Sequence, residues 1–105
     1  MRLKHVKNAD NIIKEGVYYI DDPKDYIGKW KELFNNNNPI YIEIGMGKGD
    51  FIIENACQYP NINFIGIEKF DSVIVRAIQK SNALELNNLK LVRMDAIEIN
   101  EVFDK

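Results

Sequence analysis

Three carboxylates and a glycine-rich turn are the residues of this sequence whose types and spacing could do chemistry. Glu43 lies two residues ahead of Gly45, the first of three glycines at every second position, while Glu68 and Asp95 each end an apolar segment. Glycine has no Cβ and tolerates positive φ, so this turn lets the backbone lie close to a ligand. A carboxylate at the end of a strand can accept hydrogen bonds from both hydroxyls of a ribose. The pattern predicts a site for a nucleotide-type cofactor.

The segments that position these residues alternate between strand and helix patterns. Apolar and β-branched residues predict strands over residues 40–44, 63–67 and 89–94, and helical periodicity predicts helices over about 48–58 and 72–86. This order requires parallel strands joined by right-handed crossovers. The carboxyl ends of parallel strands meet at one edge of the sheet, where ligands bind. The sequence therefore predicts an α/β fold with a Rossmann-like parallel sheet and all three acids at that edge.

The N-terminal third carries weaker patterns. Residues 11–14 are compatible with a helical turn and residues 17–20 with a short extended piece. Asp22, followed by proline, is a typical N-cap, which predicts a helix over about 23–34. Trp30 falls on the apolar face of that helix, so we expect it to pack on the sheet. We divide the chain into an N-terminal arm and helix over 1–39 and a partial cofactor-binding domain over 40–105.

The spacing of the glycines separates two classes of cofactor. A dinucleotide fingerprint has the form G-x-G-x-x-G, whereas this chain has Gly45-x-Gly47-x-Gly49 followed by Asp50. The carboxylate of Glu43 would repel a pyrophosphate and suits a cationic ligand. S-adenosylmethionine carries a sulfonium and an ammonium, so the charge pattern favours it over NAD. An NAD-type half-domain, or a tight turn without any ligand, remains the alternative at this point.

Residues 41–51, together with residues 64–68 and Asp95-Ala96, resemble the bacterial tRNA (guanine-N7-)-methyltransferases, which are class I S-adenosylmethionine-dependent methyltransferases. The form Glu-Ile-Gly-x-Gly-Lys-Gly is more specific than the general glycine motif of methyltransferases. The resemblance covers most of the chain, including residues 28–30 ahead of the first strand. Members of the family are roughly twice this length, the size of a full α/β domain. The chain thus resembles their N-terminal half, the first β-α-β-α-β half of the fold.

The resemblance implies S-adenosyl-L-methionine as cofactor and tRNA as partner. Gly45 and Gly47 would let the backbone approach the cofactor, and Glu43 would lie near its cationic amino-acid end. Glu68 would hold the ribose diol and Asp95 would accept a hydrogen bond from the adenine amino group. The implied reaction is attack of a guanine N7 in the variable loop on the sulfonium methyl, which needs no general base. The family's Asp-Pro-Trp-Pro-Lys type segment is not in this sequence, so we name no catalytic residue.

Composition sets limits on the class of protein. The chain has 105 residues, 46% of them hydrophobic, a net charge of −2 and a pI near 5.4, which argues against a dedicated nucleic-acid-binding domain. It has no apolar run long enough for a membrane span, and residues 1–7 do not read as a signal peptide, so we expect a cytoplasmic protein without a membrane partner. No metal site is predicted. Cys57, on the apolar side of its helix, is expected to be a buried structural thiol.

A third interpretation keeps the fold but not the catalysis. The chain could be a non-catalytic module that pairs with a second chain carrying the missing half. The strand over 40–44 would then be an edge strand with unpaired backbone groups, a site for self-association or for a complementing chain.

Overall fold

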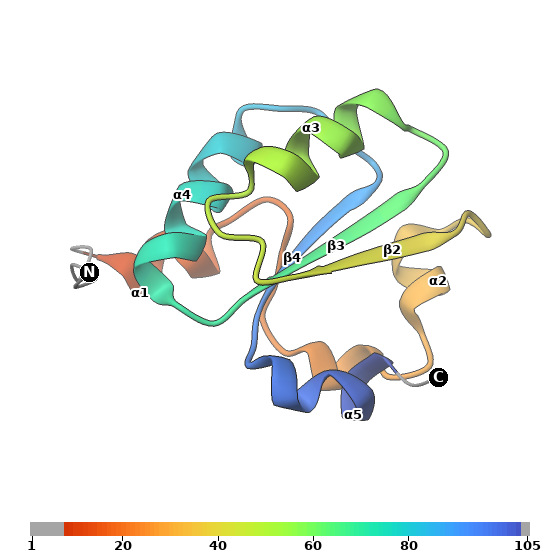
Figure 1. The fold of residues 1–105 in the computed structure, drawn as a ribbon, viewed down its shortest axis with the longest axis horizontal. Helices are drawn as coiled ribbons and strands as arrows, with labels where there is room; N and C mark the ends of the chain where they lie inside the picture. Colours follow the sequence, from red (N-terminus) through yellow and green to blue (C-terminus); the bar gives the residue numbers. More distant parts are fainter. Residues whose placement is uncertain (1–7, 104–105) are drawn as a thin grey trace.

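The computed structural model describes residues 8–103, in which helices cover both faces of a parallel sheet (Figure 1). In chain order the elements are α1 (Ala9–Lys14), β1 (Tyr19–Ile20), the 3-10 helix η1 (Pro23–Tyr26), α2 (Trp30–Phe34), β2 (Ile40–Ile44), α3 (Asp50–Gln58), β3 (Asn63–Glu68), α4 (Asp71–Asn82), β4 (Leu89–Arg93), the 3-10 helix η2 (Ala96–Glu98) and α5 (Ile99–Phe103).

The sheet has the strand order β1-β4-β3-β2 within the described residues, and every neighbouring pair is parallel. Ile42 of β2 lies opposite Ile65 of β3, and Ile65 lies opposite Lys90 of β4. β3 has a neighbour on each side and all its residues are buried. The predicted α/β fold with a parallel sheet is therefore confirmed. The extended piece over residues 17–20 supplies the two-residue strand β1, which pairs with β4.

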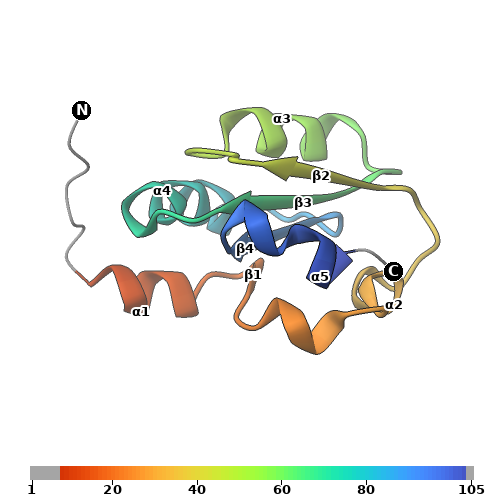
Figure 2. The same cartoon turned by 60° about the horizontal axis from the view of Figure 1, so that its bottom comes forward.

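Two hydrophobic cores lie on the two faces of the sheet because successive strand residues point to opposite sides. Helices α1, α3 and α4 cover one face, where Phe64 and Leu91 are buried among helix residues such as Ile74. The segments η1, α2 and α5 cover the other face, where Ile65 and Val92 pack (Figure 2). Within residues 8–103, no helix has both the length and the apolar character needed to cross a bilayer.

The prediction of one continuous helix over 23–34 is wrong, because the segment forms two separate short helices. The 3-10 helix η1 ends at Tyr26, and Gly28 adopts a φ of +75°, a left-handed conformation that breaks the helix. The break turns Trp30 into the core, where it is buried and its Nε1–H donates to the carbonyl of Val102 over 3.2 Å. The tertiary contact of Trp30 thus overrides the local helical pattern, and the expectation that Trp30 packs inside is confirmed. Asp22 caps η1, accepting from the Lys24 N–H.

Two further boundaries differ from the sequence-based expectation. Helix α4 ends at Asn82 rather than near residue 86, because the Tyr18 hydroxyl bonds to the carbonyl of Leu84 and the N–H of Leu86 and draws that segment off the helix axis. Its N-cap is Phe70, and Asp71, the first residue of the helix, forms an ion pair with Arg93.

Cys57 is exposed, which contradicts the predicted buried thiol. The buried stripe of α3 consists of Ile52, Ile53 and Ala56 only. Phe51 and Cys57 flank that stripe; the side chain of Phe51 is 56% exposed. Helix α3 lies over the edge of the sheet (Figure 2), where fewer elements are available to cover its margins.

Candidate functional site

A cavity of about 220 Å³ opens at the carboxyl ends of β2, β3 and β4. It is lined by Ile44, Gly45, Ile67, Glu68, Lys69, Phe70, Met94, Asp95 and Ala96. Each lining segment is the end of a strand or the first residues after it, so the parallel register brings residues from three distant parts of the chain together. Three of the five residues predicted to bind a cofactor line this cavity, namely Gly45, Glu68 and Asp95.

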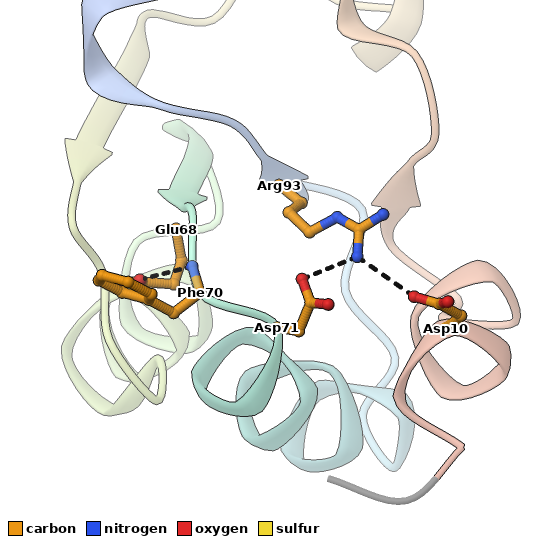
Figure 3. A network of polar contacts seen from close by, with 5 residues as sticks. All are labelled: Asp10, Glu68, Phe70, Asp71 and Arg93. Carbon is orange, nitrogen blue, oxygen red and sulfur yellow. Dashed lines mark hydrogen bonds and ion pairs between the residues drawn. The ribbon is translucent and has the colours of Figure 1, made fainter. Parts of the chain in front are cut away.

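Glu68 is held rigidly at the centre of this arrangement. Its Oε1 accepts from the Gly47 N–H and its Oε2 accepts from the Phe70 N–H, each over 3.1 Å, the latter bond being drawn in Figure 3. The residue is only 6% exposed. A carboxylate with both oxygens hydrogen-bonded to backbone is fixed in position, and each oxygen can still accept from a ligand hydroxyl. Gly47, which does not line the cavity, contributes to it through this bond.

The glycine turn adopts the conformation that its composition predicts. Gly45, Gly47 and Gly49 have φ values of +69°, +62° and +84°. The N–H groups of Gly45 and Met46 donate to the Ile67 carbonyl over 2.8 and 3.0 Å, which ties the turn to the end of β3. A Cβ built at Gly45 or Gly47 would meet no atom within 4 Å, so open space lies beside both residues.

Asp95 lies two residues after the end of β4, at the N-cap of η2. Its Oδ1 accepts from the Ile97 N–H over 3.1 Å, a side-chain cap of the first turn. The side chain is partly exposed at the cavity wall. The cap orients the carboxylate, and its acceptor capacity is not exhausted by one hydrogen bond.

Glu43 lies apart from the other predicted residues. It does not line the cavity, because it alternates with Ile44 along β2 and so points to the opposite face of the sheet. Its Oε1 is buried and has no hydrogen-bond partner within the described part of the chain. Desolvation by burial raises the pKa of this carboxyl above its usual value of 4.5. A buried acceptor without a partner suits a cationic or hydrogen-bond-donating group.

Glu43→Gln is expected to raise Tm by about 2 °C at neutral pH, a small effect because the residue as a whole is only partly buried. A pKa that is raised in the folded state means that ionisation of Glu43 opposes folding. The stability contributed by the protonated carboxyl is therefore fully present below pH 4.5 and is lost as the pH rises through the pKa of the folded state. The variant lacks this loss, so its advantage should vanish below pH 4.5. Thermal melts between pH 3.5 and 8 measure it. The exposed Glu54→Gln serves as the control, and an advantage for Glu43→Gln that persists at pH 3.5 would contradict this account.

An ion-pair network lies next to Glu68 (Figure 3). The Arg93 Nη1 lies 2.8 Å from Asp71 Oδ1 and 3.5 Å from Asp10 Oδ1, joining β4 to the first turns of α4 and α1. Burial acts to lower the pKa of Arg93, but the hydrogen bond and charge of Asp71 outweigh it and raise the pKa. Because Asp71 follows directly on Phe70, this network also fixes the backbone that holds Glu68.

Arg93→Met is expected to lower the free energy of unfolding by about 1 kcal/mol, since its two ion pairs, with Asp71 and Asp10, are partly solvated but join three elements. Urea denaturation measures the change. Lys24→Met is the matched control, because it removes the 3.6 Å pair with Glu101, in which both side chains are more than half exposed. The control should cost less than about 0.5 kcal/mol. Equal losses in the two variants would show that the Arg93 network has no special role.

Several cavity residues were not anticipated from the sequence. Phe70, Lys69 and Met94 line the cavity, and the Lys69 ammonium lies 5.1 Å from the centre of the Phe70 ring. Phe70 lies two residues after Glu68, and this closeness to the predicted strand end is the signal that could have marked it. Within residues 8–103, no group of three His, Cys, Asp or Glu side chains is placed to hold a metal ion.

Comparison with known proteins supplies the family. A sequence model described as "Putative methyltransferase" matches residues 37–105, which include the glycine turn and all three acids. The chain belongs to this methyltransferase family. The resemblance inferred from the glycine motif and strand ends is thereby confirmed.

Individual relatives agree with this assignment. A protein of Lachnoclostridium phytofermentans named tRNA (guanine-N(7)-)-methyltransferase is 50% identical over 103 residues, which cover 98% of this chain and 48% of that protein. A Bacillus subtilis protein of the same name is 49% identical over 105 residues, covering 99% of this chain and 49% of its own length. The chain therefore spans about half the length of the curated relatives it matches.

A solved structure of an antibiotic-related methyltransferase has the same fold. It superposes with a TM-score of 0.61 at 23% identity, covering 79% of this chain and 42% of that structure's chain. At this identity the likeness concerns the fold alone, and it confirms the Rossmann-like assignment.

Proposed function

We propose that this chain is the S-adenosylmethionine-binding half of an enzyme that methylates guanine N7 in tRNA. The observation that carries the proposal is the arrangement of Glu68. Its carboxylate is held by backbone N–H groups between the glycine turn and the end of β3, in a cavity shared with Gly45 and Asp95. The family match and the names of the half-matched relatives support the reaction and the substrate.

The residues present fit the cofactor in three respects. The open space beside Gly45 and Gly47 leaves room for a ligand against the turn. The carboxylates of Glu68 and Asp95 are acceptors for hydroxyl and amino groups. The buried Oε1 of Glu43 lacks a partner among residues 8–103, and its carboxylate supplies the negative charge that a cationic amino-acid group requires. A pyrophosphate would lie close to the carboxylates of Glu68 and Asp95 here, which argues against NAD.

Each residue then has a role in binding and orientation. Glu68 holds the ribose diol, Asp95 accepts from the adenine amino group, and Glu43 acts on the cationic amino-acid end, with water between where needed. When bound, S-adenosylmethionine would supply an electrophilic methyl carbon on positively charged sulfur; the lone pair of guanine N7 would attack that carbon while the carbon–sulfur bond breaks and S-adenosylhomocysteine leaves. No base is needed because N7 carries no proton. The contribution of this chain is therefore positioning of the methyl donor, which can lower a barrier substantially.

The substrate and location follow from the same proposal. The tRNA would be held largely by the half of the relatives that this chain does not match, which is consistent with the chain's net charge of −2. Because the relatives are bacterial proteins named for tRNA methylation, the proposed place of action is the cytoplasm.

Calorimetric titration of the chain with S-adenosylhomocysteine and, separately, with NAD⁺ tests the cofactor assignment. Saturable binding of S-adenosylhomocysteine, with NAD⁺ at least tenfold weaker, is the expected result. Preference for NAD⁺, or no binding of either ligand by a chain that circular dichroism shows to be folded, would overturn it. Methyl transfer to unmodified tRNA, mapped to guanine N7, then tests the reaction.

A further inference from the structure

Gly66 lies in the interior of β3, a strand whose residues are all buried. Glycine weakens the interior of a strand because it supplies no side chain for packing. Gly66 is not one of the glycines with positive φ among residues 8–103, so a special backbone conformation does not account for it. Space does: a Cβ added here would lie 2.3 Å from the Sδ of Met46, and 3.1 and 3.3 Å from terminal methyl carbons of Ile52 and Leu91. Gly66 therefore leaves a notch in the sheet that the thioether of Met46 fills.

Met46 is the residue between the first two glycines of the turn. Open space lies beside both of these glycines, yet Met46 is only 6% exposed and belongs to the core under α3 and α4. Residues two apart in a strand share a face, so the thioether in the notch occupies the place next to the Glu68 side chain. The turn is thus held against the sheet by one of its own side chains.

The backbone of the turn is tied to the same strand. The Met46 N–H donates to the Ile67 carbonyl over 3.0 Å, and the Gly47 N–H donates to Glu68 Oε1 over 3.1 Å. Two successive residues of the turn therefore bond to two successive residues of β3, and the Met46 side chain reaches the residue before them. Glycine permits many backbone conformations, so three glycines at alternate positions do not fix the shape of the turn by themselves. Packing of the Met46 side chain supplies the constraint that the glycines lack.

We propose that Met46 and Gly66 are positioning residues for the cofactor, because the thioether in the notch sets the height of the glycine turn above the end of β3. Neither residue lines the cavity, so both act through others. The thioether keeps the Gly47 N–H within hydrogen-bond reach of Glu68 and holds Gly45 at the cavity wall. The effect on cofactor affinity rests on the proposed function, whereas the effect on the turn does not.

Gly66→Ala tests this role by filling the notch with one methyl group. An unconfined methionine would rotate away from the added atom, since its side chain is flexible. Met46 is buried, and Ile52 and Leu91 also crowd the added carbon, so we expect the thioether to be displaced together with the turn. The affinity for S-adenosylhomocysteine should fall by roughly tenfold, a coupling usual for groups in contact. Calorimetric titration measures the change.

Amide exchange of Gly47 measures the position of the turn without any cofactor. Its N–H bonds to Glu68, and displacement of the turn would lengthen or break that bond. In the Gly66→Ala chain, exchange at Gly47 should accelerate by roughly tenfold through local opening. The amides in the middle of β3, which has a paired strand on each side, should change little.

Gly16→Ala is the matched control. It is the same substitution at another glycine without positive φ, and it overpacks the same core. The three atoms nearest to the added Cβ, which include Cγ2 of Ile78 at 2.8 Å, all lie outside the turn. This variant should be destabilised but should keep its affinity and its Gly47 exchange within about twofold of wild type. Equal effects of the two variants on affinity would reduce Gly66 to a merely structural role and overturn the proposal.

Met46→Ala distinguishes a steric effect on the turn from a general loss of stability. In this background the methyl group of Gly66→Ala has no Sδ to meet, so the second substitution should change affinity by less than about twofold. An affinity loss for Gly66→Ala that is the same with and without Met46 would contradict the proposal. Met46→Ala alone removes the thioether and should also speed exchange at Gly47. Unchanged Gly47 exchange in this variant would overturn the proposal even if the Gly66→Ala chain does not fold.

The two measurements distinguish failure of the positioning role from failure of the proposed function. If the wild-type chain does not bind S-adenosylhomocysteine, the cofactor assignment fails, and exchange at Gly47 still decides whether Met46 positions the turn. If the wild-type chain binds and Gly66→Ala leaves both affinity and Gly47 exchange unaltered, the cofactor assignment stands and the positioning role is overturned.

Discussion

Glu68→Ala is expected to weaken the binding of S-adenosylhomocysteine by roughly 100-fold. The substitution removes a fixed carboxylate proposed to accept two hydroxyl hydrogen bonds, and a hydrogen bond to a charged group contributes about 1.5–3 kcal/mol. The variant also leaves the Gly47 and Phe70 N–H groups without their acceptor. We therefore expect a loss of about 1–3 kcal/mol in the free energy of unfolding as well. Calorimetric titration and urea denaturation measure the two effects separately.

Two further variants show whether the effect belongs to the site. Glu68→Gln keeps the shape of the side chain but replaces one acceptor by a donor, so it should lose most of the affinity with less loss of stability. Glu85→Ala removes an exposed carboxylate from the segment before β4, at the other end of the sheet, and should leave affinity unchanged. Unaltered affinity in a folded Glu68→Ala chain would contradict the role assigned to Glu68.

Gly49→Ala is expected to lower the free energy of unfolding by about 3 kcal/mol, of which the left-handed φ of +84° accounts for about 1–2 kcal/mol and overpacking for a similar amount. An added Cβ would lie 2.8 Å from the Cβ of Ala77 and 3.1 Å from Cδ1 of Ile53, closer than van der Waals contact. It would push α3 away from α4 just where the glycine turn begins the helix. Urea denaturation measures the loss.

Gly28→Ala separates the two contributions in that prediction. Gly28 has a similar φ of +75°, but a Cβ there would meet no atom within 4 Å. Its substitution should therefore cost only the conformational part, about 1–2 kcal/mol. Equal losses at Gly28 and Gly49 would show that helix packing contributes nothing at Gly49.

Local sequence patterns were sufficient for much of the fold. The strands over 40–44, 63–68 and 89–93 were predicted within one or two residues, because buried strands of a parallel sheet are short apolar runs bounded by turn residues. The glycine turn could also be predicted from the sequence, since its three positive φ values favour glycine at each of those positions. The carboxyl-end location of Glu68 and Asp95 followed from the strand order alone.

Non-local contacts decided the remaining boundaries. The segment over 23–34 has a continuous helical pattern, yet Gly28 breaks it so that Trp30 can reach the carbonyl of Val102, 72 residues away. Helix α4 ends early because the Tyr18 hydroxyl captures the segment after it. Cys57 is exposed because no further element covers that margin of α3 in the described chain. Hydrophobic periodicity reflects residues that are close along the chain and carries no information about such distant partners.

The sequence by itself determined the class of fold, the family and the acids that gather at one edge of the sheet, because these depend on local patterns and on the single hand of parallel crossovers. Only the tertiary structure decided how each acid is used. It pins Glu68 between two backbone N–H groups, makes Asp95 a helix cap and turns Glu43 to the other face of β2 with a buried oxygen. These differences arise from side-chain direction and packing across elements, which spacing along the chain does not encode.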